Sequence, residues 1–183
     1  MSTPEHGAAT VALSNAITLQ VHSMGLGEVI QTFVGPSTKA DSRGKEADYG
    51  WGPRRPPPFA GRLSVALEVA ISETQEKLKR DVDFWLNPNE GNANMALTLK
   101  VSRNTPMVTF DTLERVNQRS HRTQHITVSK NSGDHITLSG SPMTIPFDLL
   151  FQRPISCPAE RNIQLADNEL KDITSRIWEA QGF

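Results

Sequence analysis

Residues 63–86 read LSVALEVAISETQEKLKRDVDFWL, and the spacing of the apolar residues changes part-way along this stretch. Over residues 63–71 every second residue is a large apolar one, which is the pattern of a strand that buries one face. From Ser72 onward the apolar residues fall three or four positions apart, which predicts a helix with one apolar face. The helical stripe consists of Leu78, Val82, Trp85 and Leu86.

This predicted helix has recognisable ends and leads into a second strand. Ser72 followed by Gln75 fits a capping box, in which the two side chains satisfy free N–H groups of the first turn. Pro88 ends the helix, because proline disfavours a helical conformation in the residue before it. Met95–Val101 then alternates between apolar and small or polar residues again. Strand, helix and strand together predict a βαβ unit with two parallel strands and a right-handed crossover.

The rest of the chain predicts further strands and two flanking helices. Alternating apolar residues indicate strands, and the turn residues NSGD (131–134) indicate a hairpin. Residues 1–7 predict a disordered tail, and residues 8–183 a single domain, since this length is typical of one domain. The predicted elements are a helix at 8–21, strands at 28–34, 45–51 and 107–113, hairpin strands at 124–130 and 135–139, an apolar segment at 143–151 that is either a strand or irregular, and a helix that Asp167 caps.

The composition is that of a globular protein. Of the 183 residues, 37% are hydrophobic and 21% are charged, and the net charge is −1. This charge excludes a polycationic nucleic-acid coat, so any contact with nucleic acid must come from a local patch. No apolar run approaches the ~20 residues that span a bilayer, and the single cysteine, Cys157, excludes a disulfide framework. We therefore expect an intracellular protein, in the cytoplasm or the nucleus, with no membrane partner.

Two acidic residues are candidates for a metal site. Glu68 lies on the strand face that otherwise carries only small residues, where an unpaired carboxylate is costly. Asp48 lies near the end of the preceding predicted strand, about twenty residues earlier. Two carboxylates and a substrate phosphate are the ligands with which nucleases hold Mg²⁺, and the ion activates water as the phosphodiester breaks. Taken alone, such a spacing is a weak signal, and the buried placement of Glu68 strengthens it.

Four segments resemble a known group of proteins in their order and spacing. They are KEADYGWGPR (45–54), LSVALEVAISE (63–73), KLKRDVDFWL (77–86) and NMALTLKV (94–101). The pattern resembles fungal proteins related to the PD-(D/E)XK nuclease superfamily, and it is similar to a bacterial family of predicted restriction endonucleases. The likeness runs from about residue 28 to the C-terminus. Asp48 matches the motif aspartate, Glu68 the motif glutamate, Ser72 and Glu73 the Ser-Glu turn, and Asp81, Trp85 and Leu86 the helix.

The resemblance implies a fold, a metal and a substrate. The fold is α/β, a restriction-endonuclease-like core of the order αβββαβ around a mixed central sheet, with an added C-terminal β-hairpin and helix. Asp48 and Glu68 are expected to hold Mg²⁺ or Mn²⁺, and the expected activity is hydrolysis of DNA phosphodiester bonds. Relatives of this kind often act as homodimers, and a homodimer is expected here by that analogy.

One departure from the family pattern affects the chemistry. The superfamily carries a lysine two residues after the glutamate, and this chain has Ala70 there. The lysine is then expected to come from the following helix, as Lys77 or Lys79, or from the next strand, as Lys100. Lys77 is preferred, because it lies one turn nearer the start of the helix than Asp81. If no lysine reaches the metal, the alternative is an inactive nuclease-like domain that binds nucleic acid or protein.

Overall fold

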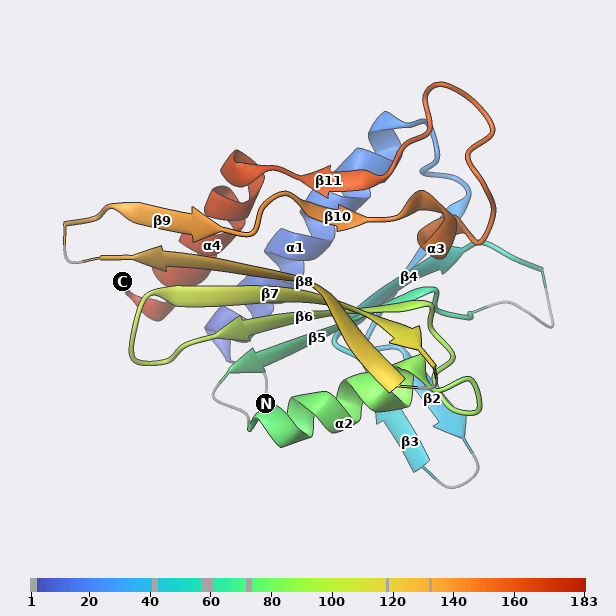
Figure 1. The fold of residues 1–183 in the computed structure, drawn as a ribbon, viewed down its shortest axis with the longest axis horizontal. Helices are drawn as coiled ribbons and strands as arrows, with labels where there is room; N and C mark the ends of the chain where they lie inside the picture. Colours follow the sequence, from blue (N-terminus) through green and yellow to red (C-terminus); the bar gives the residue numbers. More distant parts are fainter. Residues whose placement is uncertain (1–2, 41–42, 57–60, 72–73, 118, 132) are drawn as a thin grey trace.

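The centre of the molecule is a seven-stranded mixed β-sheet (Figure 1). The structure is a computed structural model, and it describes residues 3–40, 43–56, 61–71, 74–117, 119–131 and 133–183. In spatial order the strands of the sheet are β1 (Ile30–Val34), β4 (Tyr49–Pro53), β5 (Val65–Ile71), β6 (Met95–Val101), β7 (Met107–Val116), β8 (Arg119–Lys130) and β9 (Ile136–Ser139).

Strand β5 lies inside the sheet, as its alternating sequence predicts. It pairs antiparallel with β4 and parallel with β6, and helix α2 (Gln75–Leu86) makes the crossover between the two parallel strands. With helix α1 (Pro4–Ser23) at the start, and apart from a separate hairpin between β1 and β4, the chain order is α1, β1, β4, β5, α2, β6. This is the predicted αβββαβ order, so the α/β fold class and the βαβ unit are confirmed.

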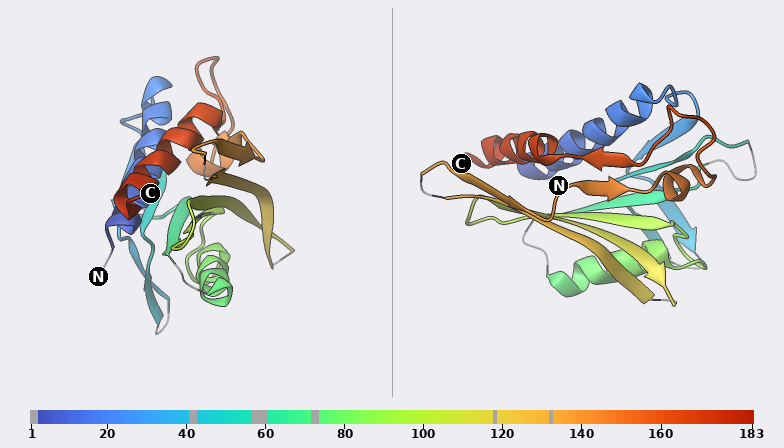
Figure 2. Two further views of the ribbon diagram at one scale, coloured as in Figure 1. Left: turned by 90° about the vertical axis from the view of Figure 1, so that its left-hand side faces the viewer. Right: turned by 45° about the horizontal axis from the view of Figure 1, so that its top comes forward.

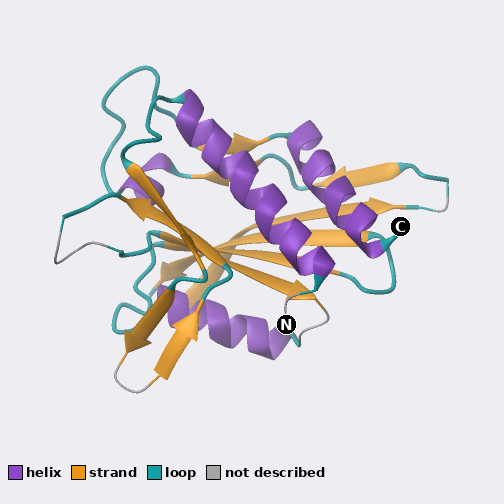
Figure 3. Ribbon diagram, turned by 180° about the vertical axis from the view of Figure 1, so that it is seen from behind, coloured by secondary structure: helices purple, strands orange, loops and turns teal. Residues whose placement is uncertain are grey.

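Two helices cover the first face of the sheet. The large apolar residues of β5, from Val65 to Ile71, point to this face and pack against α1 and α4 (Asp167–Gln181). Figures 2 and 3 show these two helices side by side on one side of the sheet, with α2 on the other. The buried positions of α1 recur every four residues, which puts them on one stripe of the helix. They are Ala9, Leu13, Ile17 and Val21.

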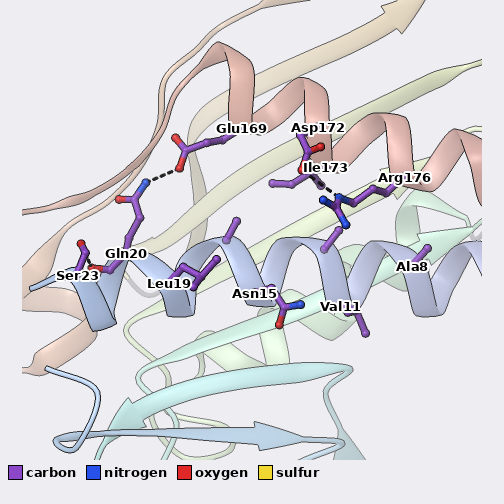
Figure 4. Close-up of a pocket in the computed structure, with 12 residues that line it drawn as sticks. Ala8, Val11, Asn15, Leu19, Gln20, Ser23, Glu169, Asp172, Ile173 and Arg176 are labelled. Atoms are coloured by element: carbon purple, nitrogen blue, oxygen red, sulfur yellow. Dashed lines mark hydrogen bonds and ion pairs between the residues drawn. The ribbon is translucent and has the colours of Figure 1, made fainter. Parts of the chain in front are cut away.

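A groove runs along the outer side of the α1–α4 pair (Figure 4). Small residues of α1 form its floor, and Leu19 lies on it with 70% of its surface exposed. Its polar groups bond to one another: Gln20 Nε2 donates to Glu169 at 2.9 Å, and Arg176 pairs with Asp172 at 3.0 Å. The groove therefore presents paired polar groups and apolar surface.

Helix α2 covers the second face. Ala66 and Ala96 on the strands are small, so the helix approaches the sheet closely. Val82, Trp85 and Leu86 of the predicted stripe are buried against the sheet, and Leu78 at its start is half-buried. Thr74 caps the helix, because its side chain accepts a hydrogen bond from the backbone N–H of Lys77. The predicted cap at Ser72, and Glu73 beside it, lie outside the described residues.

The structure also adds elements that the sequence did not predict. Helix α1 begins at Pro4, inside the segment expected to be a disordered tail. A hairpin leaves the sheet between β1 and β4, so the single strand predicted over 45–51 divides into the end of the hairpin and the start of β4. The apolar segment 143–151 divides into a short strand and a short helix. The additional elements are β2 (Ser37–Ala40), β3 (Arg43–Glu46), β10 (Met143–Ile145), α3 (Phe147–Phe151) and β11 (Ile163–Leu165).

The C-terminal prediction is confirmed in outline. The strands β8 and β9 pair antiparallel as the predicted hairpin, and the stripe of the last helix is buried. The helix begins with Asp167 as its first residue, and Ala166 occupies the capping position. Over the residues that the structure describes, no helix is both long and apolar enough to cross a membrane.

Candidate functional site

Glu68 is a buried acid beneath helix α2. It lies in the middle of β5 on the face that carries Ala66 and Ala70, and only 7% of its surface is exposed. The indole Nε1 of Trp85 donates a hydrogen bond to Glu68 Oε1 at 2.5 Å. Because Trp85 is held in the helix–sheet interface, this bond fixes the orientation of the carboxylate. The sequence predicted both the buried acid and the inward-facing tryptophan, but it gave no reason to connect them.

A lysine contacts this acid, and it is one that the sequence analysis did not select. Lys45 extends from β3 of the added hairpin, and its Nζ lies 3.3 Å from Glu68 Oε1 and 2.8 Å from Asp81 Oδ1. Asp81 comes from α2, so three separate elements meet at this ammonium group. The sequence could have pointed to this lysine, because Lys45 lies in the segment KEADYGW, three residues before the motif aspartate Asp48. Only the hairpin, which the sequence did not predict, turns it toward β5.

Asp48 lies beside Glu68 at the start of β4. Tyr49 pairs with Leu67 across the two strands, and the Asp48 backbone N–H donates to the Leu67 carbonyl. One Asp48 carboxylate oxygen accepts a hydrogen bond from the Val69 backbone N–H at 2.7 Å. The other lies 3.1 Å from His6 Nε2, a residue of α1. Each oxygen of Asp48 therefore has a partner that holds the side chain against β5.

The surroundings of Glu68 raise its pKa from 4.5 to about 7. Burial is the main cause, because it penalises the charged form of the carboxyl group. The charges of Asp48 and Asp81 raise the pKa further, while Lys45 and the Trp85 hydrogen bond lower it. Glu68 can thus exchange a proton near neutral pH. We call Asp48, Glu68, Asp81 and Lys45 the acid cluster.

The other lysines named from the sequence lie elsewhere. Lys77 is exposed on the first turn of α2, and no ion pair joins it to Asp48 or Glu68. Lys79 lines clefts on the side of α2 that faces β7 and β8, and Lys100 lines one of them. The physical reason is the helix phase: with Val82 and Trp85 against the sheet, Lys77 is exposed on the first turn, and Lys79 lies on the flank toward β7 and β8, away from Glu68. The lysine beside Glu68 is that of the hairpin.

The acid cluster offers oxygen ligands of the kind that Mg²⁺ and Mn²⁺ prefer. Glu68 Oε2 accepts no hydrogen bond from the described residues, and the negative charge of Asp48 acts on Glu68 from the neighbouring strand. Over the same residues, no group of three or more His, Cys, Asp or Glu side chains is arranged to hold a metal. Mg²⁺ is commonly held by one or two carboxylates, with water and substrate phosphate as its remaining ligands. The residues present fit a site of that two-carboxylate kind.

The chain was compared with protein families, curated proteins and solved structures. No protein-family model matches the chain, and no curated protein matches its sequence. The chain is similar to the crystal structure of a putative nuclease belonging to DUF820 from Anabaena variabilis. The identity is 11%, the match covers 94% of this chain and 82% of that chain, and the TM-score is 0.49. The fold and the site described above therefore depend on the strands, helices and contacts of this chain itself.

Proposed function

We propose that the protein is a metal-dependent nuclease that hydrolyses DNA phosphodiester bonds at the acid cluster. The observation that supports this most is the ammonium group of Lys45, 3.3 Å from Glu68 Oε1. A nuclease site of this kind needs a positive group near the metal-binding carboxylates, where it stabilises negative charge that develops on the phosphate. Ala70 leaves the usual strand position for this group without a charge, and Lys45 supplies the charge from β3.

In this proposal each residue of the cluster has a separate role. Asp48 and Glu68 would hold Mg²⁺ or Mn²⁺, which when bound activates water and neutralises phosphate charge. The Val69 N–H and the Trp85 indole keep the two carboxylates in fixed orientations. Lys45 is held at the cluster by Asp81, so its charge is already in position before substrate binds. Such prior placement lowers the cost of reorganisation during the reaction.

A second function is favoured by the same ion pair. Lys45 bridges Glu68 and Asp81, so its single positive charge offsets part of the negative charge of both carboxylates without any metal. A protein that has lost catalysis can keep its buried acid in this way, because a buried charge must be paired. The second candidate is therefore an inactive nuclease-like domain that binds nucleic acid or protein through its surface.

The deciding experiment is a cleavage assay on plasmid and single-stranded DNA, with Mg²⁺ and with Mn²⁺. We compare the wild type with Glu68→Gln and Lys45→Met, which keep side-chain size while they remove charge. Both variants are expected to lose turnover by a factor on the order of 10²–10³. Lys130→Met is the matched control, since the ion pair that Lys130 forms among the described residues is with the exposed Asp134, at 3.1 Å.

The outcomes separate the two candidates. Loss of cleavage in both cluster variants, with normal cleavage by Lys130→Met, supports the nuclease. If the wild type cuts neither DNA substrate with either metal, the nuclease proposal fails and the inactive nuclease-like domain is the remaining candidate. Cleavage that is unchanged in Glu68→Gln would place any activity outside the acid cluster and contradict the proposal.

A further inference from the structure

Helix α2 has a second functional flank, on the side away from Glu68. Two neighbouring clefts of about 580 and 890 Å³ lie between α2 and the paired strands β7 and β8, and Lys79 and Ser120 line both of them. The strands and the helix run side by side here (Figures 1 and 2). We call the two clefts together the α2–β8 trough.

The α2–β8 trough is basic although the whole chain is not. Its walls hold five cations and three carboxylates, whereas the chain has a net charge of −1. The cations come from helix α2 and from strands β6, β7 and β8. They are Lys79, Lys100, Arg115, Arg119 and Arg122.

Two of the three carboxylates of the trough, Asp111 and Asp83, contact neighbouring side chains, the third, Glu76, is exposed, and most of the five cations have no ion-pair partner among the described residues. Asp111 lies 2.6 Å from His125 Nδ1 and 3.6 Å from Arg122, and Asp83 accepts a hydrogen bond from Ser120. Within the part of the chain that the structure describes, Lys79, Lys100 and Arg119 form no ion pair. The cations outnumber the carboxylates by five to three, so positive charge is available to a ligand, and Thr98 and Asn89 add a hydroxyl and an amide group to the lining.

The trough is separate from the acid cluster. Asp81 and Trp85 face β3 and β5 from one flank of α2, while Lys79, Val82 and Leu86 face β6, β7 and β8 from the other. The body of the helix lies between the two sites. A ligand in the trough can therefore bind without touching Glu68 or a metal.

We propose that the α2–β8 trough binds the phosphodiester backbone of a nucleic-acid strand. The trough is elongated along α2, whose twelve residues span about 18 Å, so it matches a chain of phosphates better than one compact anion. Separated cations with hydroxyl and amide donors are the groups that contact phosphate oxygens in protein–DNA interfaces. The choice of nucleic acid over another polyanion rests on the proposed nuclease function.

The test is fluorescence anisotropy with labelled single-stranded and duplex DNA, in EDTA so that no metal contributes. Wild-type binding should weaken steeply between about 50 and 200 mM salt, because displaced counterions oppose it. The double variant Lys79→Gln/Arg119→Gln should bind on the order of tenfold more weakly. Its plot of log affinity against log salt should also be shallower, by about 1.4 for a single strand and about 1.8 for a duplex.

The matched control is Lys171→Gln/Arg176→Gln, which removes the same charge from α4 on the opposite face of the sheet. It should change the affinity by less than about twofold. Equal weakening by both double variants, no DNA binding by the wild type, or equally tight binding of an acidic peptide such as oligoglutamate would overturn the proposal.

This test is independent of the nuclease proposal. Binding in EDTA reports on the trough, and cleavage in Mg²⁺ reports on the acid cluster, so each proposal has its own readout. If trough variants weaken binding while no protein cuts DNA, the trough proposal stands and the nuclease proposal fails. If cleavage depends on Glu68 while the trough variants bind normally, the reverse holds.

Discussion

Glu68 beneath α2 and Glu160 in the loop before β11 are both buried glutamates, at 7% and 8% exposure, but they differ in the donors around them. Glu160 receives two hydrogen bonds from Arg153, at 2.6 and 2.9 Å, and two more from Ser156. These donors lower its pKa to about 2. Among the described residues, Glu68 contacts only the donors Trp85 and Lys45, both at one oxygen, and with two other acids nearby its pKa rises to about 7.

The difference separates a structural acid from a candidate catalytic one. Glu160 is fully partnered, so its charge is stable and it joins two parts of one loop. In Glu68 both contacts are made by Oε1, and Oε2 accepts no hydrogen bond from the described residues. Burial therefore raises the pKa of the carboxyl group more than its partners lower it. A buried carboxylate with a raised pKa is typical of a site that binds a cation or transfers a proton. If this difference between Glu68 and Glu160 is functional, substitutions at the two positions should have different effects on activity and on stability.

The largest expected effect is on catalysis. Under the proposed function, Glu68→Gln should lower the rate of DNA cleavage by a factor on the order of 10²–10³. Glu160→Gln should leave the rate of the folded protein within about twofold, because Glu160 does not touch the acid cluster. Cleavage rates per folded molecule, measured in Mg²⁺, check this. Equal losses of cleavage rate in Glu68→Gln and Glu160→Gln would mean that the two glutamates differ only in their effect on stability.

The next effect is on stability as a function of pH, in the absence of metal. Glu68 titrates near 4.5 in the unfolded chain and near 7 in the folded protein, so the folded state binds more protons between these values. Stability contributed by Glu68 is therefore lost as the pH rises from about 4.5 to 7. Relative to wild type, Glu68→Gln should gain on the order of 3 kcal/mol in unfolding free energy between about pH 4 and pH 8.

Glu160 should show the opposite sign in the same denaturation series. Its pKa is depressed, so its contribution is complete above the ordinary value of 4.5 and is lost as the pH falls toward 2. Glu160→Gln should therefore be less stable than wild type at neutral pH and approach it in acid. The same pH dependence of unfolding free energy in Glu68→Gln and Glu160→Gln would contradict the opposite pKa shifts of the two glutamates.

A smaller effect is expected from the Trp85 indole. Trp85→Phe keeps the ring packing but removes the donor to Glu68, so it should raise the pKa of Glu68 further. The expected cost is about 1–2 kcal/mol of unfolding free energy at pH 8, where Glu68 is charged. NMR titration of the Glu68 carboxyl carbon measures the shift. Trp178→Phe is the control, because the buried Trp178 indole N–H has no partner among the described residues.

The smallest effect is expected from Lys77, the lysine that the sequence favoured. Lys77→Ala removes an exposed charge from α2 and should change the unfolding free energy by less than about 0.5 kcal/mol. Its effect on cleavage should be far below that of Lys45→Met. If Lys77→Ala instead lowers turnover by the larger factor, the α2 lysine acts in the reaction and Lys45 has a structural role.

The sequence by itself determined the frame of this protein. The alternation over 63–71, the helical stripe up to Leu86 and the second alternation over 95–101 depend on local periodicity, and each becomes the predicted element. The buried position of Glu68 follows from the same periodicity, because residues two apart in a strand share a face. Asp48 was identified by its spacing and its resemblance to a motif.

Only the tertiary structure decided which groups surround Glu68. Lys45 is separated from it by a hairpin turn, a strand and a loop, and no local pattern specifies that the hairpin folds back over β5. The rotation of α2 about its axis also depends on how Val82 and Trp85 pack, and this packing turns Lys79 toward β8 and Asp81 toward Lys45. Periodicity fixes which residues share a face, whereas contacts between distant segments depend on packing of the whole chain, and those contacts set the charge of the site.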